Sequence, residues 1–413
     1  MSSDKSPVVS GRIAAVQTPK PSSRLSSIDA LRGIVMIVMA LDHMRDFFHI
    51  GAMSFSPTDL AKTTPILFFT RWITHFCMPL FMFTAGMGAF LFLQHHHTRA
   101  QLSRFLWTRG LWFILLELMV MQFAYNFTFS ASYPILLLVL WIFGICFVVM
   151  AGLVYLPIRW LAILSLLVIV FHNCLDGIDA TRFGSAAPVW NVLHQPGVFK
   201  VGGRIAVIAY PLIPWVAVIA VGFCFAQIFQ QEPAVRQKIM LRLGIALTLG
   251  FVILRAFNHY GDPAPWSHQK SAVFTLLSFL NCTKYPASLA FLLMTLGPGL
   301  LLLAYLDRRK FNLTNPLIVF GRVPMFYFVL HFYLIHILVV IAAFLRYGAS
   351  AAHFIFNPVP SMTGPPELFP ANFGYSLGVV YGVWALTVAL LYPICRWFAG
   401  VKARRRDWWL SYL

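Results

Sequence analysis

The sequence is poor in charge: only 11% of its 413 residues are Asp, Glu, Lys or Arg, whereas 59% are hydrophobic. Soluble globular proteins carry about 25% charged residues, so this composition excludes an ordinary soluble enzyme. No polar stretch approaches the roughly 50 residues that a small soluble domain needs. The mean hydropathy of +0.76 and the repeated apolar runs therefore predict an integral membrane protein.

Acidic residues are scarcer still, with 13 Asp and Glu against 31 Lys and Arg, and the formal net charge is +18. This excess does not indicate a nucleic-acid partner, because the basic residues lie in short runs between apolar segments, as the positive-inside rule predicts. The six cysteines have no spacing typical of a metal site. The chain is therefore expected to contact a lipid bilayer and no nucleic acid.

Apolar segments of about 20 residues are long enough to cross a bilayer as helices. Ten such segments occur, at 31–48, 72–94, 109–127, 135–156, 158–175, 206–229, 241–257, 285–306, 317–345 and 374–398. Lys and Arg are concentrated in alternate connections, which places those connections and both termini in the cytoplasm. The expected fold class is all-α, a polytopic transmembrane helical bundle of about ten spans.

The first span ends in an unusual cluster of ionisable residues, namely Asp42, His43, Arg45, Asp46 and His49. Charged side chains at the bilayer centre cost roughly 2.5–3.5 kcal/mol each on insertion scales, so the cluster predicts a functional site. On a helix, Asp42, Asp46 and His49 share one stripe, and a carboxylate one turn from an imidazole orients it as a general base. The structural alternative is a polar cap at the end of the helix.

Later segments add four candidate substrate-binding residues: His75, Glu117, Lys284 and His331. His75 is expected at the same membrane level as His49. Glu117 is an intramembrane carboxylate, for which a hydrogen bond between helices is the alternative. Lys284 lies beside the helix breaker Pro286, and such breaks often mark ligand cavities. No compact metal-binding motif accompanies these residues, so no metal is expected.

Residues 24–49, RLSSIDALRGIVMIVMALDHMRDFFH, resemble the opening helix of bacterial relatives of heparan-alpha-glucosaminide N-acetyltransferase, in the transmembrane acyltransferase superfamily. The spacing from Arg32 to His43 also resembles the signature of bacterial integral-membrane O-acyltransferases. Similar stretches follow at 74–91, 109–118, 280–298 and 315–336. The resemblance thus covers most of the chain after residue 24.

The resemblance implies an acyltransferase that moves an acetyl or other acyl group from cytoplasmic acyl-CoA to an amine or hydroxyl on the outer side. The implied acceptor is an envelope glycan or another small molecule. The lysosomal member uses a histidine after its first helix as the catalytic base, and His49 is the nearest match by position. This chain has a longer loop before Pro79 and has His43 where that member has Asn. The base is therefore His49 or His43, with Asp46 or Asp42 as the orienting acid.

An acyl-CoA donor carries phosphates, which cations on the inner side must bind. The candidates are Arg32, Arg104, Arg109 and Arg322. The expected domains are a disordered cytoplasmic tail at 1–24, a transmembrane acyltransferase-like domain at 25–400, and a basic and aromatic cytoplasmic tail at 401–413. The expected location is the bacterial inner (plasma) membrane, and an oligomer is compatible with the sequence.

A proton-coupled small-molecule transporter or exporter is the alternative function. In that case Asp42, Asp46, Glu117 and the histidines would form a proton relay. The chain shows no internal repeat, and its polar cluster is confined to one helix, which is unlike an inverted-repeat transporter. A scaffold without chemistry would leave the first-helix cluster unexplained. Acyl transfer is therefore the preferred hypothesis.

Overall fold

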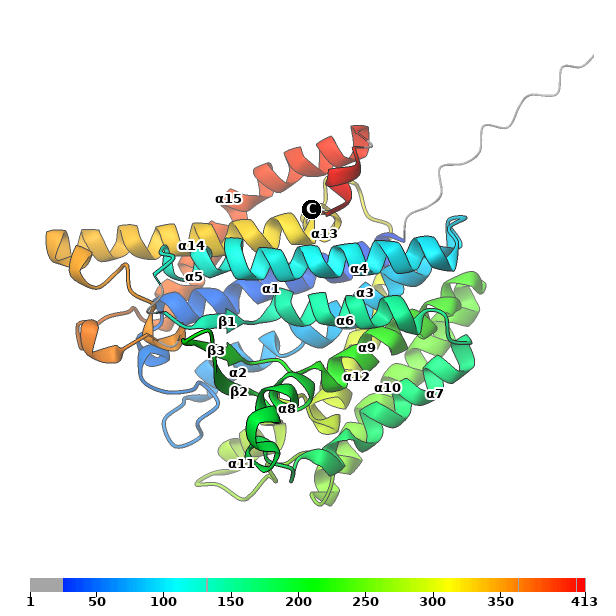
Figure 1. The fold of residues 1–413 in the computed structure, drawn as a ribbon, viewed down its shortest axis with the longest axis horizontal. Coiled ribbons are helices and arrows are strands. Elements are labelled where there is room, and N and C mark those ends of the chain that lie inside the picture. The colour runs from blue at the N-terminus through cyan, green and yellow to red at the C-terminus, as the bar shows by residue number, and fades with distance from the viewer. Residues whose placement is uncertain (1–24, 131–132, 363, 406, 413) are drawn as a thin grey trace, which may run out of the picture.

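The computed structural model describes residues 25–130, 133–362, 364–405 and 407–412, and the tail expected at 1–24 lies outside them. The described chain is a helical bundle with one small sheet (Figure 1). Its α-helices are α1 (Ser26–Phe48), α2 (Pro65–Thr74), α3 (Cys77–Gln94), α4 (Arg99–Leu116), α5 (Gln122–Asn126), α6 (Val139–Leu153), α7 (Ile158–Phe171), α8 (Ala187–Leu193), α9 (Leu212–Phe225), α10 (Pro233–Phe257), α11 (Ala272–Leu280), α12 (Leu289–Asp307), α13 (Pro316–Arg322), α14 (Pro324–Tyr347) and α15 (Leu377–Arg404). The all-α helical bundle predicted from hydropathy is confirmed.

Eight helical stretches of the described chain are long and apolar enough to cross a membrane. They are Pro65–Gln94, Arg99–Asn126, Ile158–Leu175, Leu212–Gln230, Pro233–Phe257, Leu289–Asp307, Pro324–His353 and Leu377–Arg404. Helix α6 is apolar but shorter, with 15 residues, and α1 carries five charged side chains in its 23 residues. These two helices coincide with the remaining expected spans, so the number of actual crossings stays a prediction.

Local sequence signals fix where several helices begin. Thr98 and Gln101 form a reciprocal capping box at the start of α4, which satisfies two backbone donors at once. Ser288 accepts from the Phe291 N–H at the start of α12. Proline occupies the first turn of α2, α10 and α14, where its missing N–H costs nothing.

The expected spans at 135–156 and 206–229 begin as strands rather than as helix, which corrects the sequence prediction. Strands β1 (Ile135–Leu137) and β3 (Arg204–Ile208) pair in parallel, and β2 (Gly197–Val201) pairs antiparallel with β3. Gly202 and Gly203 form the hairpin turn with φ of 54° and 82°, as a type I′ turn requires. Short apolar runs of this kind look the same in a strand and in a buried helix.

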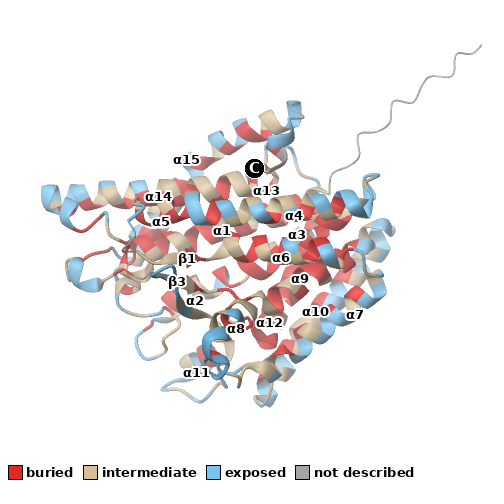
Figure 2. Ribbon diagram, viewed as in Figure 1, coloured by how far each residue is buried: buried red, intermediate tan, exposed pale blue. Residues whose placement is uncertain are grey.

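Helix α1 lies in the interior of the bundle and packs against α3, α12, α13, α14 and α15. The peripheral helices α7, α10 and α15 instead expose many residues (Figure 2). Their exposed side chains include Leu166, Ile253 and Trp397. Large apolar groups on the outside of a bundle suit a lipid environment, which is as apolar as the side chains themselves.

The two ends of the described chain lie together, because Leu25 and Tyr412 line the same cavity. The tail expected at 401–413 begins inside α15, which continues to Arg404, and Leu410 beyond it is buried. The basic connections predict that this end of the bundle faces the cytoplasm. We refer to it below as the inner end, and to the opposite end as the outer end.

Candidate active site

A pair of imidazole rings joins α1 to α14. The Nδ1 atom of His43 lies 2.7 Å from the Nε2 atom of His331, and the two rings stack with centroids 5.0 Å apart. Phe332 packs against the His43 ring at 4.2 Å. His331 is fully buried, whereas His43 is partly exposed. The sequence prediction named both residues but did not anticipate that they contact each other.

The contacts of this pair determine which nitrogen of His43 is available. The Nδ1 atom of His331 lies 3.2 Å from the carbonyl oxygen of Tyr327, and a carbonyl oxygen only accepts. His331 therefore carries its proton on Nδ1, and its Nε2 atom accepts a hydrogen bond in the neutral ring. It follows that His43 donates from Nδ1, and its Nε2 lone pair remains available to take a proton.

The two carboxylates of the cluster are paired with arginines, which corrects the expected carboxylate–imidazole arrangement. Arg45 donates to Asp42 at 3.0 Å and to Asp46 at 2.7 Å, and Arg71 of α2 pairs with the second oxygen of Asp42. A buried carboxylate is stabilised more by the charge of a guanidinium group than by a neutral imidazole. Asp42 therefore holds α1 against α2 through Arg71, and among the described residues neither carboxylate hydrogen-bonds His43 or His49.

His49 follows α1 directly, and its backbone bridges to Tyr375. Its Nδ1 atom accepts a hydrogen bond from the Gly51 N–H at 3.1 Å, so the neutral ring carries its proton on Nε2. Burial, and secondly the charge of Arg45, lower the pKa of His49 below its ordinary value. His49 is thus a neutral hydrogen-bond donor whose lone pair is already engaged.

Aromatic and basic side chains surround Asp42 on the outer side. The Lys284 ammonium lies 5.3 Å from the Tyr285 ring centre and 5.9 Å from that of Tyr210, and the two hydroxyls are 3.2 Å apart. Burial opposes ionisation of Tyr285, but the charges of Lys284 and Arg71 outweigh it and lower the pKa of this phenol. The site thus combines a cation with phenol groups that can bind a polar ligand.

His75 and Glu117 occupy different surroundings. His75 ends α2, is 3% exposed, and its Nδ1 atom has no hydrogen-bond partner among the described residues. Glu117 is fully buried and accepts from the backbone N–H groups of Leu140 and Trp141 at the start of α6, and from the Tyr125 hydroxyl. A carboxylate at a helix N-terminus is a capping group, so Glu117 positions α6, as the helix-to-helix alternative predicted.

A cavity of about 730 Å³ lies at the inner end of the bundle. Along α1 it extends from Leu25 to Met36, and along α14 it extends to Phe328. Phe328 in turn contacts the rings of His43 and His331, at centroid distances of 6.4 and 5.5 Å. One aromatic side chain of the cavity wall, Phe328, therefore separates the cavity from the imidazole pair.

The charged lining of this cavity is mostly basic. Its cations among the described residues are Arg32, Arg109, Arg236, Arg322 and Lys402, against the single carboxylate of Asp29. Three of the four arginines predicted to bind a phosphate-bearing donor thus line one cavity. Arg104 is the exception, because it is exposed and is not among the lining residues. It lies on a different face of α4 from Arg109, as their spacing of five residues on a helix already implies.

Sequence reasoning missed Arg71, Tyr210 and Tyr285. A signal for Arg71 was present, since an arginine inside an apolar segment needs a buried anion, and Asp42 is such an anion. No comparable signal marks Tyr210 or Tyr285, because tyrosine is common at membrane interfaces.

The chain matches the model of a known family. The model described as heparan-alpha-glucosaminide N-acetyltransferase, catalytic, matches residues 24–253, more than half of the chain. No curated protein matches the chain. The matched region contains His43, His49 and Arg71, whereas Lys284 and His331 lie beyond its end.

Proposed function

Because the chain belongs to the catalytic family of heparan-alpha-glucosaminide N-acetyltransferase, we propose that it transfers an acetyl group from acetyl-CoA to an amine or hydroxyl, with His43 as the base. The family and the apolar helices make it an integral membrane protein of the acetyltransferase class. In our proposal the donor binds in the inner cavity, and the acceptor approaches from the outer side.

The observation that carries this proposal is the position of the imidazole pair at the apolar wall of a cation-lined cavity. Arginine binds phosphate oxygens strongly through paired N–H groups, which suits the phosphates of coenzyme A at Arg32, Arg109 and Arg322. The cavity then continues toward Met36 and Phe328, in the direction that a thioester arm would take. From Met36 to His43 the helix rises by about 10 Å.

The proposed reaction is direct transfer. The acceptor nitrogen or oxygen attacks the carbonyl carbon of the thioester while the Nε2 atom of His43 takes its proton. The carbon–sulfur bond then breaks, and the departing sulfur receives that proton from His43. The products are the acetylated acceptor and free coenzyme A. General base catalysis of this kind contributes about 10²–10⁴ in rate, and His331 keeps the reactive nitrogen of His43 unprotonated through its own hydrogen bond.

The remaining polar residues act on the acceptor side in this proposal. The chain of ion pairs Asp46–Arg45–Asp42–Arg71 fixes the outer end of α1. Lys284 then offers its ammonium to oxygen atoms of the acceptor. The family name refers to an amino sugar, and we propose an amine or hydroxyl of an envelope glycan here. His75 and His49 are placed by this proposal at the acceptor's entrance, as hydrogen-bonding groups.

The topology completes the proposal. We propose that both termini face the cytoplasm of a bacterial cell, that 25–400 forms the acyltransferase domain, and that 1–24 and 401–413 are its flanking tails. The concentration of Lys and Arg at the inner end supports this orientation. The reaction would thus carry an acetyl group from cytoplasmic acetyl-CoA to the outer side of the inner membrane.

Purified protein in detergent tests this proposal with acetyl-CoA as the probe. Acetyl-CoA should raise the unfolding temperature, because a ligand that binds only the folded state stabilises it. Radiolabelled acetyl-CoA should then acetylate glucosamine or a short amino-sugar oligosaccharide, with free coenzyme A released in equal amount. Free acetate without acetyl-glycan would indicate that the acceptor class is wrong.

A transporter would behave differently in the same preparation. It would show neither stabilisation by acetyl-CoA nor release of coenzyme A. It would instead move a solute across liposomes in response to a pH gradient without any acyl donor. That pair of results would overturn the acetyltransferase proposal.

A further inference from the structure

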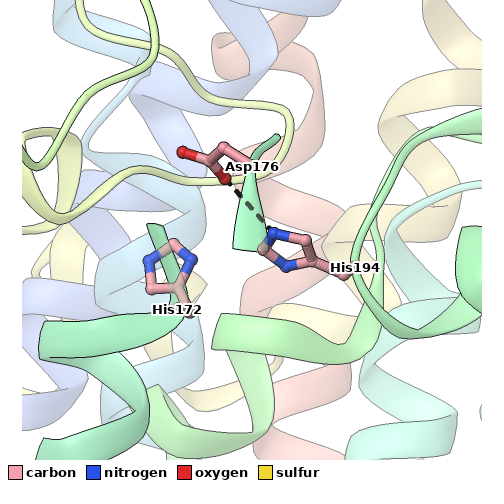
Figure 3. Close-up of side chains that lie close together, drawn as sticks. All are labelled: His172, Asp176 and His194. Atoms are coloured by element: carbon pink, nitrogen blue, oxygen red, sulfur yellow. Dashed lines mark hydrogen bonds and ion pairs between the residues drawn. The ribbon is translucent and has the colours of Figure 1, made fainter. Parts of the chain in front are cut away.

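The connection between α7 and α9 gathers two histidines and an aspartate at the outer end of the bundle. His172 begins the short helical turn that follows α7, Asp176 comes directly after that turn, and His194 follows α8. Figure 3 shows the two rings and the carboxylate around a common space. One ligand atom from each residue lies within 4.8 Å of the others, and this is the one such group in the described chain.

The histidines are buried but poorly satisfied. His172 is 3% exposed and His194 is 2% exposed. Both ring nitrogens of His172 and the Nδ1 atom of His194 lack a hydrogen-bond partner among the described residues. Buried polar groups are normally paired, and each exception needs an explanation such as a bound ion. A His172 nitrogen without a partner, close to the Asp176 carboxylate and to a His194 nitrogen, is the arrangement that a cation would complete.

The carboxylate is already oriented for such a role. Asp176 is held through one oxygen by the side-chain amide of Asn173, at 2.7 Å, while its other oxygen lies 3.2 Å from the Nε2 atom of His194. The side-chain amide oxygen of Asn173 also accepts a hydrogen bond from the Leu289 N–H at the start of α12. A second residue that fixes a ligating carboxylate is a regular feature of metal sites.

The distances suit a small transition-metal ion. At metal–ligand bonds of about 2.0–2.1 Å, tetrahedral ligand atoms lie roughly 3.3 Å apart. The Asp176–His194 separation of 3.2 Å is close to this value, and the His172 ligand atom lies within 4.8 Å of the other two, so a bound ion would draw it inward. Two imidazoles and one carboxylate favour Zn²⁺ or a similar ion over Mg²⁺ or Ca²⁺, which prefer oxygen ligands.

We propose that His172, Asp176 and His194 bind one Zn²⁺ ion, with water in the fourth position. The ion joins the end of α7 to the end of α8 and, through Asn173, to the start of α12. It thereby fastens the outer connection 172–211 onto the bundle. On binding, the Nε2 atom of His194 exchanges its hydrogen bond with Asp176 for the metal, and the proton of the ring resides on Nδ1.

The experiment uses full-length protein without a polyhistidine tag, in which His95, His96 and His97 are replaced by Ala. These three consecutive histidines are the chain's other imidazole-rich stretch, and their removal excludes adventitious binding there. After treatment with a chelator, the protein is titrated with Zn²⁺ and with Co²⁺. We expect one ion per chain, visible absorption typical of tetrahedral Co²⁺, and a higher unfolding temperature with Zn²⁺.

Variants identify the ligands. His172→Ala and His194→Gln should abolish stoichiometric binding and the Co²⁺ absorption. Asp176→Asn should weaken Zn²⁺ binding by more than about tenfold, because loss of a residue that only supports a metal ligand already lowers affinity by about that factor. His268→Ala, which removes an exposed histidine, should bind as the parent does. Cys174→Ser should also bind normally, which excludes the neighbouring thiol as a ligand.

Two results would overturn the site: no ion bound by the parent protein, or unchanged binding in both His172→Ala and His194→Gln. If His172→Ala does not fold, His194→Gln and Asp176→Asn decide the question, because they preserve side-chain volume. None of these measurements depends on acetyl transfer, so the metal site and the acetyltransferase proposal stand or fall separately.

Discussion

At the scale of single residues, the site distinguishes its two candidate bases by their hydrogen bonds. His43 has its Nδ1 atom engaged with His331, which leaves its Nε2 lone pair available, whereas the lone pair of His49 is engaged with the Gly51 N–H. The family resemblance favoured His49 by position, and spacing alone left both open. We therefore propose His43 ahead of His49 as the base on the ground of their ring tautomers, which the sequence alone does not specify.

Replacement of His43 tests this order. His43→Gln should lower kcat for acetyl transfer by about 10²–10⁴, the usual contribution of a general base, with little change in the KM for acetyl-CoA. His49→Gln should lower kcat much less. His336→Gln serves as a control, because His336 is a buried histidine of α14 that bonds the Ala124 carbonyl instead. A larger loss in His49→Gln than in His43→Gln would reverse the assignment.

His49 also predicts a dependence of stability on pH. Its pKa is lowered in the folded state, so below about pH 6.5 the unfolded chain binds a proton that the folded chain resists. The stability contributed by neutral His49 is therefore present above pH 6.5 and is lost as the pH falls toward the folded pKa. Unfolding temperatures measured from pH 7.5 to pH 5 should fall less steeply in His49→Gln than in the parent. If the unfolding temperatures of the two proteins fell equally with pH, the lowered pKa of His49 would be contradicted.

The charged residues of α1 show what sequence reasoning can and cannot give. The cost of charge in lipid marked Asp42, His43, Arg45 and Asp46 as a cluster, and they do lie together. Their pairing could not be read from α1, because Asp42 finds its second partner in Arg71 on another helix. Helical spacing predicts contacts within one helix, whereas a buried charge selects its partner from the whole fold.

At the scale of helices, the bundle depends on close approach through glycine. Gly33 of α1 faces the Leu317 backbone of α13, and Gly321 of α13 faces the Asp29 backbone of α1. Small residues at such crossings let membrane helices pack closely without a hydrophobic driving force. This crossing also places Arg32 and Arg322 beside the same cavity.

Alanine at this crossing should separate the two helices. Gly33→Ala and Gly321→Ala would each place a methyl group on backbone atoms of the other helix, so we expect a loss of about 1–3 kcal/mol or more, as for other overpacked sites. Gly152→Ala is the matched control, because nothing lies within 4 Å of its added methyl group. It should be neutral or slightly stabilising. Thermal unfolding in detergent measures all three, and equal stability in all would dismiss the crossing as a constraint.

The helical segments themselves were predictable, but the small sheet was not. Hydropathy located every long helix, because a run of about 20 apolar residues is typical of a helix that crosses a membrane. It failed at 135–137 and 206–208, where short apolar runs form β1 and most of β3. Pairing between strands so distant in sequence depends on where α6 and α9 bring them, and a local pattern holds no information on that.

At the scale of the whole molecule, the inner cavity collects cations from helices far apart in the sequence. Arg32, Arg109 and Arg322 come from α1, α4 and α13, and they line one cavity. Their identity as cations was visible in the sequence, but their convergence depends on the fold. The same sequence reasoning also selected Arg104, which does not line the inner cavity.

The difference between Arg109 and Arg104 supplies a test of the donor site. Arg109→Gln and Arg322→Gln should each raise the KM for acetyl-CoA by about 10–100-fold, since a hydrogen bond to a charged group contributes about 1.5–3 kcal/mol. Arg104→Gln, on the exposed face of α4, should leave that KM unchanged. Initial rates over a range of acetyl-CoA concentrations decide between them. An equal effect in Arg104→Gln would mean that the cations act through general surface charge.

The arrangement of the two ends predicts a direction for the reaction. The cation-lined cavity lies with both described chain ends, whereas Lys284 and the ion-pair chain lie toward the outer end, beyond the His43–His331 pair. Acetyl-CoA carries several negative charges and does not cross lipid, because a charge is costly in the hydrocarbon core. Inside-out membrane vesicles should therefore use acetyl-CoA added to the medium, whereas right-side-out vesicles should not until detergent opens them. Labelled acetyl groups should appear on acceptors enclosed in the inside-out vesicles. Equal use of external acetyl-CoA by both sealed preparations would contradict an inner donor site and an outer acceptor site, and it would require donor and acceptor to bind His43 from the same side.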